Sequence, residues 1–172
     1  MSSTRKSIII SGIFSLALSV SVLAQSNFDL PQNIELKTRD DYVKYEGTII
    51  DAAKWLELTD LDKEVEKRKR VNSFVMQWVT GTPTINIVVN RTTTRLAGKN
   101  APLMVIYLAS YARYCLETKV TNDAFSANKA AIQSMMKVYK KGIQIKKTKE
   151  MDKLIKLSDE GQLDQYIKEN FE

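Results

Sequence analysis

The sequence predicts a mostly α-helical protein that forms a single domain of five or six helices. Apolar residues recur at spacings of three and four along most of the chain, which is the period of one helix face. Asn, Asp and Thr stand before several of these stretches and Gly stands after them, as helix-capping residues do. A length of 172 residues, with 44% apolar and 27% charged residues, is ordinary for one globular domain.

The chain divides into a signal peptide (1–24), an N-terminal tether (25–39) and a helical domain (40–172). Arg5 and Lys6 precede an uncharged, apolar stretch from Ile8 to Ala24, the order found in secretory signals. The alternative is an uncleaved membrane anchor, but this stretch is short for a span of ~20 residues. We therefore expect cleavage after Ala24 and an exported protein, periplasmic or extracellular, with no transmembrane span in the mature chain.

Cys115 is the single cysteine, so no intrachain disulfide can form. An exported protein without disulfides fits a bacterial periplasm or exterior better than a small eukaryotic secreted domain. Cys115 lies between Tyr114 and Leu116, and we expect it to be buried as a small apolar residue rather than to act as a reactive thiol.

The first helix is expected over about residues 40–58. Thr59 or Asp60 can cap the second helix, which carries Trp78 on its buried stripe and stops at Gly81. The buried face of the first helix comprises Tyr42, Tyr45, Ile49, Ala52 and Leu56.

Residues 84–89 interrupt the helical pattern. Their β-branched, alternating residues are typical of a strand, in which Ile85, Ile87 and Val89 would face the core. The fold can therefore include a small two-stranded β element, in which a strand from Ile34 to Thr38 pairs with residues 84–89. Residues 92–96, in what is otherwise a polar loop, are the other candidate partner, and an unpaired edge could accept a strand from another protein.

The remaining helices follow clear boundary residues. Asn100 is expected to cap a central helix that is apolar nearly all round, because a soluble helix of that kind is surrounded by other elements. Asn122 and Gly142 bound the next helix, Thr148 caps a fifth, and Gly161 separates it from a short last helix.

The residues that are missing exclude most enzyme chemistry. The chain has no His, which rules out Ser-His-Asp and Cys-His catalysis and His-ligated metal sites. It also lacks the glycine-rich loops that cradle phosphates. We therefore expect no catalytic residue, no cofactor and no metal. The remaining alternative is an enzyme that uses carboxylate or Tyr/Lys chemistry.

A lysine-rich stretch from Lys137 to Lys156 carries eight lysines against Glu150 and Asp152. Such an excess predicts an anionic partner surface, such as an envelope component or an acidic protein, although a solvated lysine-rich face is the alternative. Nucleic acid is disfavoured because the stretch has no Arg for bidentate contacts. The candidate residues are Lys137, Lys140, Lys141, Lys146, Lys147 and Lys149.

Tyr107, Tyr111 and Tyr114 share one face of the central helix and form a weaker ligand candidate. Aromatic stripes can hold flat ligands, but at this spacing they more often belong to the core. Taken together, the sequence predicts an exported, soluble, non-enzymatic binding or interaction module of the cell envelope.

Overall fold

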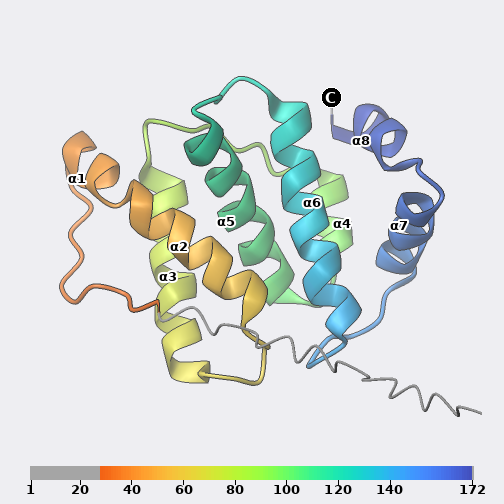
Figure 1. Cartoon of the computed structure of the whole chain (residues 1–172), viewed down its shortest axis with the longest axis horizontal. Helices are drawn as coiled ribbons and strands as arrows, with labels where there is room; N and C mark the ends of the chain where they lie inside the picture. Colours follow the sequence, from red (N-terminus) through yellow and green to blue (C-terminus); the bar gives the residue numbers. More distant parts are fainter. Residues whose placement is uncertain (1–27, 172) are drawn as a thin grey trace, which may run out of the picture.

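The computed structural model describes residues 28–171, and within this range all the regular secondary structure is helical (Figure 1). The mostly helical, single-domain fold that the sequence predicts is confirmed, but the expected five or six helices are too few. The eight helices of the described residues are α1 (Arg39–Lys44), α2 (Glu46–Leu58), α3 (Val65–Gly81), α4 (Arg91–Ala97), α5 (Ala101–Thr118), α6 (Ala124–Lys141), α7 (Lys149–Asp159) and α8 (Leu163–Phe171).

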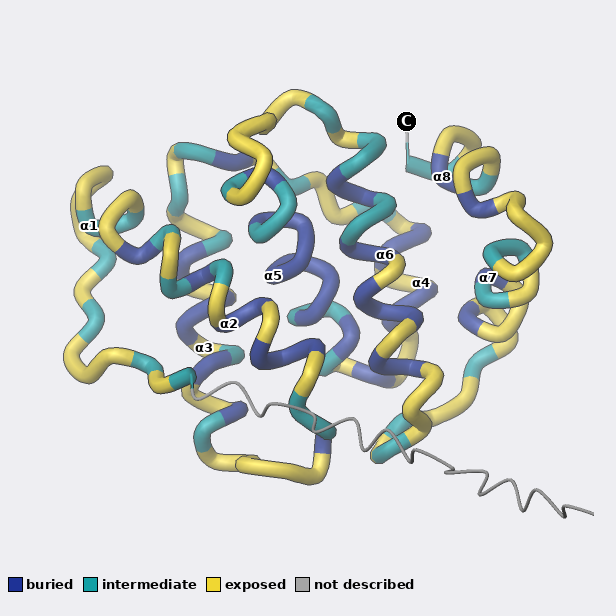
Figure 2. The backbone as a smooth tube through the Cα atoms, viewed as in Figure 1, coloured by how far each residue is buried: buried dark blue, intermediate teal, exposed yellow. Residues whose placement is uncertain are grey.

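Helix α5 is the centre of the fold, as its apolar sequence predicts. It packs against α2, α3, α4 and α6, and its middle turns are buried along their whole length in Figure 2. Leu103, Ile106 and Tyr107 are each at most 1% exposed. Trp78 of α3 is fully buried beside this core, and its indole nitrogen donates to the backbone oxygen of Tyr42 at 2.9 Å.

The expected first helix is two helices, because the chain turns at Tyr45. The Tyr45 amide bonds to the Tyr42 oxygen three residues back, at 3.2 Å, instead of continuing the regular helical ladder. Gly47 follows at once, and glycine costs ~1 kcal/mol relative to alanine inside a helix. The short α1 is stabilised by a capping box between Thr38 and Asp41.

Helix α4 lies where the sequence predicts a polar loop. The Asn90 side chain accepts a hydrogen bond from the Thr93 amide at 2.9 Å and so caps the helix start. Thr92, Thr93 and Leu96 then bury one face of the helix against the core. Capping and burial therefore override the low helix propensity of three consecutive threonines.

The expected β element is wrong: no strand occurs within residues 28–171. Ile34 and Leu36 alternate because they pack along the helical core, and Ile85 (6% exposed) does the same. Val89 was expected to face the core but is 46% exposed. In the described part of the chain, no hydrogen bond joins the backbone of residues 85–89 to any other group.

Two helix starts also differ from expectation. The helix predicted to follow Thr59 or Asp60 begins only at Val65. The buried Arg68 guanidinium explains the delay, because it donates to the backbone oxygens of Thr59 at 2.6 Å and Asp60 at 3.2 Å and so holds this turn. Helix α6 is capped by Asp123 rather than by Asn122.

The predicted signal peptide and its cleavage after Ala24 lie outside the described residues. Across residues 28–171, no helix combines the length and the apolar character that crossing a membrane requires. The described part of the predicted tether lies against the domain, where the Phe28 ring is 6.2 Å from that of Trp55.

Candidate binding site

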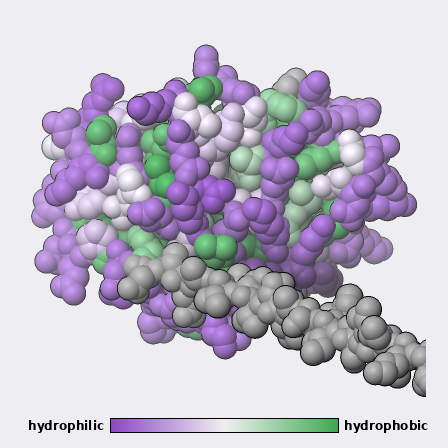
Figure 3. Space-filling view, viewed as in Figure 1, coloured by the Kyte–Doolittle hydropathy of each residue, from purple (hydrophilic) through white to green (hydrophobic). Residues whose placement is uncertain are grey.

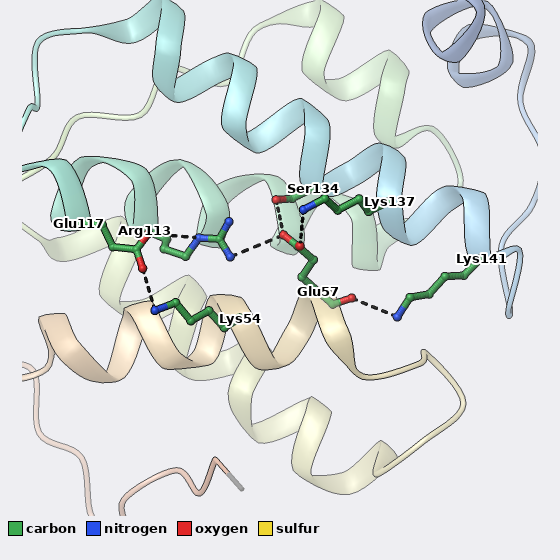
Figure 4. Close-up of polar contacts among 7 residues, drawn as sticks. All are labelled: Lys54, Glu57, Arg113, Glu117, Ser134, Lys137 and Lys141. Carbon is green, nitrogen blue, oxygen red and sulfur yellow. Dashed lines mark hydrogen bonds and ion pairs between the residues drawn. The ribbon is translucent and has the colours of Figure 1, made fainter. Parts of the chain in front are cut away.

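The three candidate lysines of α6 all form ion pairs, so their charges are largely neutralised. Figure 4 shows two of them, Lys137 and Lys141, reaching from α6 towards the end of α2. The pairs are Lys137–Glu57 at 2.8 Å, Lys140–Asp159 at 3.3 Å and Lys141–Asp60 at 3.1 Å.

Glu57 joins three helices through its buried carboxylate (Figure 4). It accepts hydrogen bonds from Ser134 at 2.5 Å and Lys137 at 2.8 Å, and Arg113 of α5 lies 3.6 Å away. Burial alone would raise the pKa of Glu57, but the hydrogen bonds and charges of these partners lower it below the usual value. Glu57 therefore holds α2, α5 and α6 together in its charged form.

Lys141 has a further structural role at the end of α2. Its ammonium group donates to the backbone oxygens of Glu57 at 3.2 Å and Leu58 at 2.7 Å. These are terminal carbonyl groups without partners inside the helix, where a cation is favourable. The lysines of α6 thus contribute to the architecture.

The candidate lysines Lys146, Lys147 and Lys149 lie beyond α6, in the loop of residues 142–148 and at the start of α7. All three are exposed, and none has a carboxylate partner among the described residues. Asn100 fixes their loop: its amide nitrogen donates to the Lys146 oxygen at 2.9 Å, and its amide oxygen accepts from the Lys146 nitrogen at 2.8 Å. Asn100 was expected to cap α5, but its side chain makes no capping bond and binds this loop instead.

Tyr139 holds the other end of the same loop. Its hydroxyl accepts from the Thr148 amide at 2.7 Å and donates to the Asp152 carboxylate at 2.8 Å. The Lys147 ammonium group lies 4.4 Å from the centre of the Tyr139 ring, a cation–π distance. The backbone of the loop is therefore held by two buried side chains, those of Asn100 and Tyr139.

Three further cations belong to the same region: Arg95 and Lys99, which lie elsewhere in the sequence, and Lys153 of α7. Lys99 adjoins Asn100, and the neighbouring Gly98 lies so close to Thr148 that an added Cβ would be 3.4 Å from its methyl group. We define the basic surface as Arg95, Lys99, Lys146, Lys147, Lys149 and Lys153, all exposed and without an ion pair in residues 28–171.

A cleft with a volume of about 170 Å³ lies at the edge of the basic surface, between α4, α7 and α8. Arg95 and Lys153 line it together with Tyr166 and Asn170. Glu150 is its single carboxylate, so it lacks the pair of carboxylates that the carboxylate form of the enzyme alternative requires. The volume is below the ~300–1,000 Å³ of pockets for drug-sized ligands. The cleft therefore suits a small charged group.

The tyrosine stripe lies mostly inside the core. Tyr107 is fully buried and Tyr111 is 4% exposed, while Tyr114 is half-buried. The Tyr107 hydroxyl donates to Asn128 at 2.5 Å, and burial raises the pKa of Tyr107 to about 12. Cys115 is 1% exposed, and burial raises the pKa of its thiol to about 11, which makes it a poor nucleophile at neutral pH.

The face of the molecule in Figure 3 is mainly hydrophilic, with hydrophobic residues scattered among hydrophilic ones. Within the described range, no group of three or more Cys, Asp or Glu side chains could hold a metal ion. No protein family, curated protein or solved structure matches the chain.

Proposed function

We propose that the protein is an exported, non-enzymatic binding module that uses its basic surface to bind an anionic component of the cell envelope. One observation carries this proposal: six exposed cations from four neighbouring segments have no carboxylate partner in residues 28–171, and three of them stand on a fixed loop and helix start. Other unpaired cations, such as Arg70 and Lys119, are scattered over separate elements.

The physical basis is electrostatic attraction to a negatively charged surface. Each Lys or Arg close to an anionic membrane contributes ~1 kcal/mol, and the attraction falls off within a Debye length of ~8 Å at physiological salt. Because Asn100 and Tyr139 already order the loop, little conformational entropy is lost when the lysines meet their partner. Export itself rests on the sequence of residues 1–24.

The test is binding to vesicles that contain phosphatidylglycerol, measured by sedimentation at low and physiological salt. Replacing Lys146, Lys147 and Lys149 with Gln should weaken binding about a hundredfold, since three contributions of ~1 kcal/mol are lost. The matched control replaces Lys44, Arg70 and Lys119, which are also exposed and unpaired, with Gln.

The control should bind almost as well as the wild type if the basic surface is the binding site. Equal weakening of both variants would show that only the net charge matters and would overturn the proposal. Retention of vesicle binding after the loop substitutions would overturn it too.

A further inference from the structure

The cleft beside the basic surface brings together three hydrogen-bond donors from three helices. Arg95 comes from α4, Lys153 from α7 and Tyr166 from α8. In the described residues, neither cation has an ion pair and the Tyr166 hydroxyl has no hydrogen-bond partner. Their donors are therefore available to a ligand.

The neighbouring contacts hold this cleft in shape and occupy only one of the five N–H donors of Arg95. Thr92 accepts a bond from Arg95 at 3.4 Å. The Asn90 side chain, which caps α4, also donates to the Asn170 backbone oxygen at 2.8 Å and so ties α4 to α8. Arg95 and Tyr166 line the same cleft, and burial raises the pKa of Tyr166 although the charge of Arg95 partly offsets this rise.

We infer that this cleft binds one phosphate group of the anionic partner, with Arg95, Lys153 and Tyr166 as its donors. A tetrahedral phosphate offers oxygens in several directions, which suits donors from three helices better than the two coplanar oxygens of a carboxylate. Arg supplies a planar fork for two of these oxygens and Lys a point charge. The small volume fits such a group and not a complete cofactor.

Glu150 provides a second test, because its substitution should change phosphate binding in the direction opposite to that of the Arg95 substitution. Its carboxylate lines the same cleft but forms no ion pair with Arg95 or Lys153. It therefore repels a bound phosphate without neutralising the cations. Removing its charge should strengthen phosphate binding, whereas removing the charge of Arg95 should weaken it.

The inference rests on the proposed function, and the experiment separates the two. Inorganic phosphate is titrated into the full chain and followed by chemical-shift changes, and vesicles containing phosphatidic acid are used in parallel. The variant Arg95→Gln should weaken phosphate binding about tenfold or more, Tyr166→Phe should weaken it less, and Glu150→Gln should tighten it severalfold.

The comparison of inorganic phosphate with phosphatidic acid vesicles shows whether the ligand is a soluble phosphate compound or a lipid headgroup. Phosphate binding in solution together with tighter vesicle binding by Glu150→Gln supports a phosphate-bearing lipid headgroup, while solution binding alone supports a soluble phosphate compound. The substitutions at Lys146, Lys147 and Lys149 should weaken vesicle binding and leave the titration with phosphate unchanged.

Absence of phosphate binding by the wild type would overturn the cleft inference even if the basic surface still bound vesicles. Binding that Arg95→Gln and Glu150→Gln leave unchanged, or change in the same direction, would overturn it as well. A wild-type protein that binds inorganic phosphate but no vesicles would count against the proposed function and not against the phosphate site in the cleft.

Discussion

The lysines on the two sides of Gly142 carry the same charge but have different roles. Before Gly142, Lys137, Lys140 and Lys141 reach carboxylates on α2, on the turn after it and on α7. After Gly142, Lys146 and Lys149 stand on a fixed backbone with no such partner in residues 28–171. The comparison teaches that a run of like charges is divided by its neighbours in space. The lysines before Gly142 contribute to the fold, and those from Lys146 to Lys153 remain available for binding, whereas Lys156 pairs with Glu160.

The largest loss of stability should follow from removing the carboxylate of Glu57, which pairs with Lys137. We expect Glu57→Ala to lower the free energy of unfolding by ~3 kcal/mol, because removing one partner of a buried charge pair costs ~3–5 kcal/mol and the Lys137 side chain is partly exposed. Urea unfolding measures this. The control Glu117→Ala removes a 41% exposed carboxylate beside Arg113 and should cost less than ~1 kcal/mol. Equal losses would remove the distinction between the two sites.

A smaller effect should appear in the pH dependence of stability. The folded-state pKa of Glu57 is lowered from the usual value of 4.5. The contribution of its charge to the free energy of unfolding is therefore complete above pH 4.5 and is lost as the pH falls through the lowered pKa. The advantage of the wild type over Glu57→Gln should therefore shrink when unfolding is measured at successively lower pH from about 5 to about 3. A constant difference would show that the Glu57 charge does not stabilise the fold.

The smallest expected change in stability comes from substituting a single lysine on either side of Gly142. Lys141→Gln should lower the free energy of unfolding by ~1 kcal/mol, because the ammonium group bonds two terminal carbonyls of α2. Lys149→Gln should stay within ~0.5 kcal/mol of the wild type, as exposed substitutions usually do. Thermal unfolding of the two variants side by side tests this, and a reversed order would contradict the division.

The parts of the fold that could be predicted are those fixed by local sequence. Thr148 caps α7 through the Met151 amide, and Gly142 ends α6 in the left-handed conformation that glycine accepts readily. The position of α5 follows from its apolar sequence, because a helix that is apolar all round needs neighbours on every side. In each case one short stretch contains the whole physical reason.

The parts that could not be predicted depend on residues far apart in the chain. The three threonines of α4 suggest a strand or loop until Asn90 and the buried side of the helix are placed in space. Glu57 stands between the buried Leu56 and the exposed Leu58, so its sequence neighbours do not show that it is buried, and its partners Ser134 and Lys137 lie on α6. The cleft is likewise invisible in the sequence, since Arg95 and Tyr166 meet only through the packing of α4 and α8.

The segment between α3 and α4 has a consequence for how the molecule can be cut and rejoined. Residues 85–89 contribute no backbone hydrogen bond within the described chain, and Val88 is 69% exposed. Exposed backbone of this kind is a preferred place for proteolytic nicking and for new chain ends. Because α2 and α3 pack directly on α5, we expect the two fragments of a chain nicked at Val88 to remain associated, and separately expressed halves to reassemble by fragment complementation.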